Sequence, residues 1–192
     1  DDGNLWLGTN GGIVMFNPES MTVNNYKRAS GQQLGGFNTG SALFSQRQEV
    51  IFGGTNGLRI FNTQKLSTNE TPPPVVLTDF RIFTKSVPIN GPDAILTKGI
   101  NQSEQVTLDY KKNMFALSFA ALNYRDPDKN RYAYKLEGFD EDWREVGNKR
   151  TALYTNLDGG TYQFRVKASN NDGVWNDTGK TLTIVQLPPP WK

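Results

Sequence analysis

A short segment of this chain is written twice, and this repetition constrains the fold more than any other feature. Residues 5–17 read LWLGTNGGIVMFN, and residues 51–62 read IFGGTNGLRIFN. Thr9 and Thr55 occupy equivalent points of the two copies and lie 46 positions apart. A period of about 40–50 residues is typical of β-propeller blades. The repeat therefore predicts similar β-sheet units in the first third of the chain.

Each copy has the composition of a β-hairpin. Apolar residues flank the turn segments 9–12 and 55–57, whose Asn and Gly accept the positive φ of tight turns. Such strands need a neighbouring sheet, and about three or more repeats are needed for stability. Residues 1–68 are therefore predicted to be the C-terminal part of a propeller that lacks its other blades. We expect them to pack on the second domain or to pair with another copy through an open edge. The alternative is two unrelated hairpins with similar turns.

A polar segment separates the repeats from the rest of the chain. Residues 62–75 read NTQKLSTNETPPPV and include three consecutive prolines. Proline lacks the N–H that a sheet needs and favours extended geometry, so a semi-rigid linker is predicted at residues 69–75, with the boundary near Glu70.

Alternating apolar residues predict about seven short strands between residues 76 and 187, which is typical of an immunoglobulin-like or fibronectin-III-like β-sandwich. In residues 75–82, Val76, Thr78, Phe80 and Ile82 are expected to share one face. The later inward sets are Phe115, Leu117, Phe119 and Ala121; Tyr132, Tyr134 and Leu136; and Tyr162, Phe164, Val166 and Ala168. NLDGGTY, residues 156–162, predicts a sandwich corner where the Tyr162 hydroxyl bonds back to the backbone. The predicted fold is all-β.

Composition excludes several kinds of chemistry. The sequence has no Cys and no His, so thiol nucleophiles, Ser–His pairs and Cys or His metal sites are impossible. The net charge of +2 comes from interspersed charges, which argues against nucleic acid as a partner. No apolar run reaches the roughly 18 residues of a transmembrane helix. We expect no cofactor and no metal.

Two acidic segments partly match the patterns of a calcium-binding loop and of a catalytic carboxylate pair. Residues 126–130 with Glu137 have the acid spacing of a calcium loop, but Arg131 stands where that loop needs Gly. FDEDW, residues 139–143, places three acids consecutively on a turn, so most are expected to face water rather than to form a catalytic pair. Asn69, Asn101 and Asn176 begin N-glycosylation triplets, which also arise by chance.

The first copy, continued as LWLGTNGGIVMFNPES, resembles the two-component regulator propeller repeat. That pattern runs Leu-Trp-hydrophobic-Gly-Thr-x-x-Gly-hydrophobic. The second copy departs from it, because Phe52 replaces the Trp and Gly53 replaces the next hydrophobic residue.

Residues 132–177 resemble the three-tyrosine (Y_Y_Y) domain, which follows such propellers in hybrid two-component sensors of the Bacteroides type. Across both parts, the positions that match family motifs are Trp6, Gly8, Thr9, Gly54, Thr55, Gly57, Tyr134, Trp143, Tyr154, Gly160, Tyr162, Gly173 and Trp175. The aromatic residues of the domain fall on the inward parity of strands, so we expect core and corner roles rather than ligand contacts.

The resemblance implies a periplasmic sensor fragment that relays ligand binding in a hybrid two-component histidine kinase. It implies a carbohydrate ligand held mainly by the missing blades, a homodimer, and no catalysis by the fragment itself. The tail, residues 188–192, ends in Trp-Lys, a pair that favours the membrane boundary. The resemblance implies a transmembrane helix after Lys192.

Two other functions stay open from the sequence. One is a carbohydrate-binding accessory module of a secreted polysaccharide-processing enzyme, with Trp143 or Trp175 stacked on sugar rings in an exposed aromatic platform. The other is a structural adhesion module. We expect instead that the sandwich acts as a lever and dimerisation element rather than as a ligand pocket.

Overall fold

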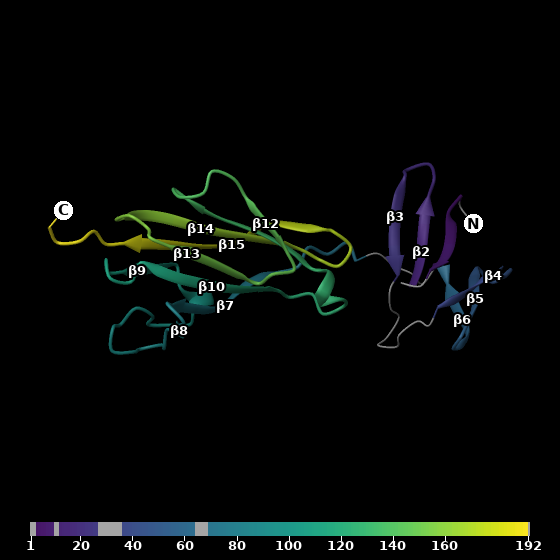
Figure 1. Ribbon diagram of the computed structural model, residues 1–192, viewed down its shortest axis with the longest axis horizontal. Coiled ribbons are helices and arrows are strands. Elements are labelled where there is room, and N and C mark those ends of the chain that lie inside the picture. The colour runs from purple at the N-terminus through teal and green to yellow at the C-terminus, as the bar shows by residue number, and fades with distance from the viewer. Residues whose placement is uncertain (1–2, 10–11, 27–35, 64–68, 192) are drawn as a thin grey trace. The chain divides into compact units, whose positions relative to one another are not determined.

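The computed structural model describes residues 3–9, 12–26, 36–63 and 69–191 (Figure 1). The chain divides into two compact units, Asp1–Thr68 and Asn69–Lys192. The described residues form strands, together with the short 3₁₀ helices η2 (Ile100–Gln102) and η3 (Pro127–Lys129). None of their helices has the length and hydropathy to span a membrane. The all-β prediction is confirmed.

The first unit contains two three-stranded antiparallel sheets. One has the order β1 (Leu5–Thr9), β2 (Gly12–Asn17), β3 (Thr22–Tyr26), and the other β4 (Phe37–Phe44), β5 (Glu49–Gly54), β6 (Gly57–Asn62). The repeated segment forms the first two strands of one sheet and the last two of the other. A complete repeat would therefore have four strands, the number in a propeller blade. The assignment to a propeller stays a prediction.

The two copies differ in register by one residue at the turn. Thr9 pairs with Gly12 across the first hairpin, whereas Gly54 pairs with Gly57 across the second. The second turn therefore uses residues 55–56, and residues 10–11 lie outside the described residues. The additional glycine of the first copy accounts for the offset.

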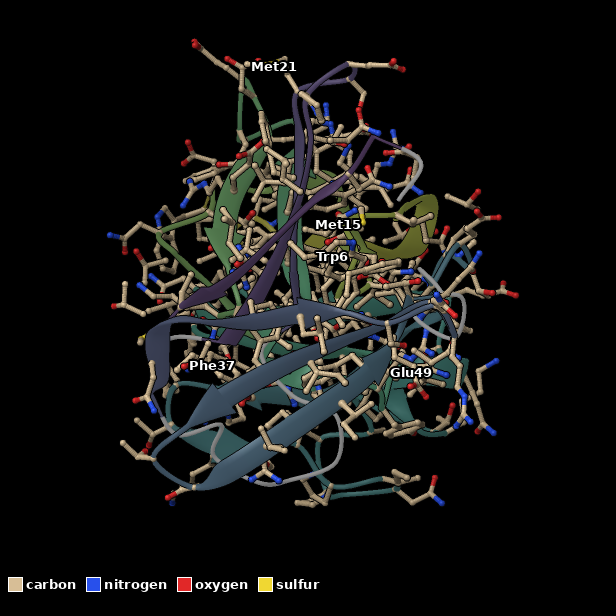
Figure 2. The ribbon with its side chains drawn as sticks, turned by 90° about the vertical axis from the view of Figure 1, so that its right-hand side faces the viewer. Trp6, Met15, Met21, Phe37 and Glu49 are labelled. Atoms are coloured by element: carbon tan, nitrogen blue, oxygen red, sulfur yellow. The ribbon has the colours of Figure 1, made fainter. Side chains whose placement is uncertain are left out.

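One face of each sheet forms the core of the first unit. Its buried residues are Ile13, Val50, Phe52 and Phe61, with Trp6, Tyr26 and Phe37 packed against them. Trp6 stacks on Tyr26 with ring centroids 5.7 Å apart, and Phe37 lies 5.2 Å from Phe52. Figure 2 looks onto this unit and shows Trp6 beside Met15, its partner across β1 and β2.

The opposite faces of both sheets are apolar and exposed. Leu5, Leu7 and Val23 are 50–56% exposed on the first sheet. On the second sheet Leu43, Leu58 and Ile60 are 59–70% exposed, and Ile51 joins them through its pairing with both Leu43 and Ile60. The unit thus has an uncovered apolar face on each side.

The second unit is a β-sandwich, as predicted. Its sheets have the orders β13-β10-β7-β8 and β12-β11-β14-β15-β9. The strands are β7 (Val75–Ile82), β8 (Lys85–Ser86), β9 (Gln105–Leu108), β10 (Met114–Ala121), β11 (Arg131–Glu137), β12 (Arg144–Gly147), β13 (Thr151–Thr155), β14 (Gly160–Ser169) and β15 (Trp175–Gln186). Neighbouring strands are antiparallel except β9, which runs parallel to β15.

Most of the predicted inward residues form the core. The sets expected on β10, β11 and β14 are buried, with Tyr162 partly so. The face predicted for β7 is wrong, because the buried residues there are Val75, Leu77, Phe80 and Ile82. The pairing of β7 with β10 shifts at Thr78, and this β-bulge exchanges the two faces halfway along the strand.

Candidate functional site

Asparagine side chains hydrogen-bond the first residues of the second unit, 69–74, to the sandwich; we call residues 69–74 the incoming segment. Asn170 is fully buried, and its Nδ2 donates hydrogen bonds to the carbonyl oxygens of Asn69 and Thr71, the latter at 2.9 Å. Asn176 donates to the carbonyl of Pro73 at 2.9 Å. Part of the segment predicted as a linker is therefore hydrogen-bonded to the sandwich, and β7 begins immediately after it at Val75.

Further amides complete this arrangement, which we call the Asn cluster: Asn69, Asn123, Asn130, Asn170 and Asn171. The side chain of Asn69 donates to Asn123 Oδ1 at 3.1 Å. Asn123 in turn donates to Asn130 at 2.8 Å and to Asn171 at 3.0 Å. Asn123 and Asn130 are buried. Buried amides that are hydrogen-bonded in this way specify one geometry and make it rigid.

Asn170 also shapes the loop between β14 and β15. Its Oδ1 accepts hydrogen bonds from the backbone N–H groups of Asp172 at 2.9 Å and Val174 at 3.0 Å. The carboxylate of Asp172 then accepts the backbone N–H of Asn69. One side chain thus fixes both the incoming segment and the loop that leads into β15.

Strand β15 connects this cluster to the C-terminal end of the unit. Its 12 residues span about 40 Å at the usual rise per residue, and Figure 1 shows the strand running along the sandwich towards the C-terminus. Beyond it, the Leu187 N–H donates to the Leu108 carbonyl at 2.8 Å. Trp191 makes an edge contact with Tyr110 at 5.3 Å between ring centroids. A single strand therefore joins the incoming segment to the outgoing tail, residues 187–191.

The motif tyrosines have structural contacts. Tyr134 and Tyr154 are buried, with ring centroids 6.1 Å apart. The hydroxyl of Tyr162 donates to the Asp158 carbonyl at 3.1 Å, which confirms the predicted corner. The hydroxyl of Tyr154 donates to Asp140 at 2.6 Å, and Arg144 pairs with the same carboxylate. Burial and, after it, this hydrogen bond raise the pKa of Tyr154.

The acidic patterns serve the fold. Within FDEDW, Glu141 and Asp142 are exposed, as expected for most of these acids, and only the side chain of Asp140 is buried, at 4% exposed. Residues 127–129 of the supposed calcium loop form η3, and Asn130 belongs to the Asn cluster. No group of acids suited to a metal ion occurs among the described residues.

The motif tryptophans are covered by cations. Lys167 Nζ lies 4.8 Å from the Trp143 ring and 5.4 Å from the Trp175 ring. Arg165 and Lys135 also lie over Trp143, at 5.6 and 5.9 Å. Both rings are partly buried. They do not form the open aromatic platform that the carbohydrate-binding alternative requires.

The motif residues of the repeats also have structural roles. A Cβ at Gly8 would come within 2.9 Å of Phe52 Cδ1, and one at Gly54 within 2.7 Å of a backbone oxygen. Thr9 Oγ1 donates to the Gly12 carbonyl at 2.8 Å. The backbone N–H of Thr55 donates to the Gly36 carbonyl. Of the remaining motif glycines, Gly57 and Gly173 have positive φ in turns, and Gly160 begins β14.

Sequence reasoning missed the Asn cluster. Asparagine is typical of turns, so the run of Asn170, Asn171 and Asp172 indicates a loop but not its partners. Those partners lie about a hundred positions away, at Asn69 and Thr71. The sequence around Asn123 and Asn130 likewise indicates a loop and gives no sign that these side chains are buried.

Comparison with known proteins relates the second unit to a known family. Residues 123–186 match the Y_Y_Y domain family. The chain is 38% identical over 189 residues to "Histidine kinase P4" of Formosa agariphila, a match that covers 98% of this chain and 14% of the relative.

The chain is also similar to solved structures. The extracellular domain of BT3049 from B. thetaiotaomicron, described as a hybrid two-component system, matches 98% of this chain and 25% of that one, with a TM-score of 0.79 and 26% identity. The extracellular domain of BT4673 from the same organism matches 99% of this chain and 25% of its own length, with a TM-score of 0.58 and 26% identity. The chain thus spans about a quarter of these structures. The homologues indicate that it is an extracellular part of a two-component sensor, as its sequence resemblance implied.

Proposed function

We propose that this chain relays ligand binding to the membrane within a hybrid two-component histidine kinase. In this proposal a carbohydrate binds upstream propeller blades, the Y_Y_Y domain dimerises in the periplasm, and a transmembrane helix follows Lys192. The observation that carries the proposal is the continuous connection from the Asn cluster through β15 to Trp191.

The first unit supports the presence of further blades. Its two sheets bury one face against each other and leave Leu5, Leu7, Leu58 and Ile60 exposed on the outer faces. Each further sheet that packed there would bury apolar area worth about 25 cal/mol per Å². Carbohydrate binding is assigned to those blades because Trp143 and Trp175 are partly buried and have cations over their rings.

The relay follows from rigidity. A ligand shifts an equilibrium only when it binds one arrangement of the subunits better than another. Since the incoming segment is hydrogen-bonded to the loop before β15, a displacement of that segment would carry the sandwich with it rather than bend at residues 69–74. The two outgoing tails of a dimer would then change their separation or their angle.

Crosslinking in the full receptor tests this relay. Because the 192 residues have no cysteine of their own, Pro190→Cys introduces a thiol into this part of the receptor at the outgoing tail, and any cysteine elsewhere in the receptor is replaced by Ser. We expect disulfide crosslinking between subunits to change when a carbohydrate ligand, selected by calorimetry from an oligosaccharide panel, is added. Asp128→Cys, an exposed position in η3, is the matched control. Identical crosslinking of Pro190→Cys with and without ligand would contradict the relay.

A further inference from the structure

We propose that the outgoing end of the sandwich rests on the lipid surface, with Phe83, Ile89 and Trp191 in the headgroup layer. This inference rests on the proposed function, because it takes the tail to lead into a membrane. It adds a direct contact between the folded domain and lipid, made by the insertion loop, residues 83–96.

Several loops meet at this end of the unit. Figure 1 shows the segment after β8 at the same end as the C-terminal tail. The Phe83 N–H donates to the Met114 carbonyl at 3.0 Å, which ties the β7–β8 turn to the start of β10. Lys112 pairs with Asp109 and, at 3.5 Å, with Asp93 of the insertion loop. Leu187 and residues 93–95 line a common cavity of about 340 Å³.

These loops expose large apolar side chains. Phe83 is 49% exposed, Ile89 55%, Leu187 44% and Trp191 75%. Single exposed apolar residues are ordinary, but here they occur on two segments of one end, the insertion loop and the outgoing tail, around the point where the chain leaves the domain. Aromatic side chains favour the interface between lipid and water.

The backbone conformation at Phe83 is unfavourable for a bulky side chain. Phe83 and Thr84 are the central residues of a two-residue hairpin turn, and Phe83 has a φ of 55°. A positive φ at the first central position favours Gly, and a bulky side chain there is strained. Burial does not compensate for the strain, since half of the side chain remains exposed. Residues in such conformations are enriched at functional sites, although turns elsewhere in the chain also contain them.

The loop itself is well ordered, which suits it to present a fixed surface. The Asn90 N–H donates to the Leu96 carbonyl at 2.7 Å, and the Ala94 N–H donates to Gly91 at 2.9 Å. Ile89 also forms a bridge with Leu96. Ile89 is therefore held outward by the backbone.

Charges of both signs occur at this end. Lys112 pairs with Asp93 and Asp109, so its charge is neutralised locally. A surface with paired charges and exposed aromatic residues suits insertion into a zwitterionic headgroup layer, whereas adsorption to anionic lipid requires a large excess of Lys and Arg.

A tethered chain tests the contact. The sequence has no His, so a C-terminal His tag attaches the chain uniquely to phosphatidylcholine vesicles that contain a nickel-chelating lipid. Ile89→Cys carries a polarity-sensitive dye, and Leu122→Cys, 40% exposed and hydrogen-bonded to Pro74 at the incoming end, is the matched control. We expect dye fluorescence at position 89 to rise about twofold or more on vesicles, and the control to stay unchanged.

Phe83→Gly separates contact from folding. This substitution relieves the backbone strain, so the melting temperature should stay the same or rise, while the dye response at position 89 falls towards that of the control. An equal response at positions 89 and 122, no response at either, or an undiminished response in Phe83→Gly would overturn the proposal. So would sedimentation showing that this end pairs two copies without lipid. The tag holds the tail at the membrane whether or not the chain relays a signal. A negative result in this experiment would therefore contradict the lipid contact without contradicting the relay, which the crosslinking experiment tests separately.

Discussion

The two units of this chain use similar β-strands but bury them differently. In the described part of the first, the apolar core between two sheets consists of Ile13, Val50, Phe52 and Phe61, and both outer faces remain apolar and exposed. In the second, residues from both sheets enclose a continuous core, and an aromatic group of Phe119, Tyr134, Tyr154 and Phe164 lies at its centre. A repeat shares its faces with neighbours, whereas a closed domain needs none. We therefore expect the stability of the first unit to depend on neighbouring repeats, and that of the second not to.

The largest expected effect comes from removing one core phenylalanine in each unit. Phe164→Ala should destabilise the second unit by about 3–5 kcal/mol, because a fully buried ring leaves a cavity. Phe52→Ala should lower only the transition of the first unit. Calorimetry of both variants checks this, and it would contradict the comparison if each substitution lowered one shared transition.

The next effect concerns the incoming segment. Asn170→Ala removes four hydrogen bonds from a buried amide and leaves backbone groups unpaired, so we expect a loss of about 2–3 kcal/mol. Hydrogen exchange should accelerate at the amides of Asp172 and Val174. Asn113→Ala, which loses one bond of 3.5 Å, is the control and should change little. Unchanged exchange in Asn170→Ala would show that the cluster does not hold the segment.

A smaller effect depends on pH. The folded state raises the pKa of Tyr154, whereas the unfolded phenol ionises near pH 10. The stabilisation is therefore complete below about pH 10 and declines as the pH rises further. Tyr154→Phe should lose about 1–2 kcal/mol at neutral pH and show a weaker alkaline decline in denaturant titrations. A decline as steep as that of the unmodified chain would exclude Tyr154 as its source.

The sequence predicted those parts of the fold in which alternation is uninterrupted. Phe115, Leu117 and Phe119 on β10 follow one parity, and the Tyr162 corner has a local signal in the preceding Gly pair. The β7 faces were wrong because a bulge at Thr78 changes the parity without any mark in the residue types. Strand β12, Arg144–Gly147, was missed because it is short, polar and edge-positioned.

The candidate site was harder to predict than the fold. The Asn cluster depends on side-chain amides that meet across about fifty to a hundred positions, and pairing of that kind leaves no periodic pattern. The motif tyrosines were predictable as core and corner residues because strand parity alone places them inward.

Hydrogen exchange across the whole chain tests the central claim, that the first unit depends on neighbouring repeats and the second does not. In the 192-residue chain we predict fast exchange throughout β1–β6 and slow exchange in β10, β14 and β15. In a longer receptor that includes upstream repeats, β1–β6 should become protected while the second unit stays the same. Protection of β1–β6 equal to that of β14 in the 192-residue chain would contradict the account.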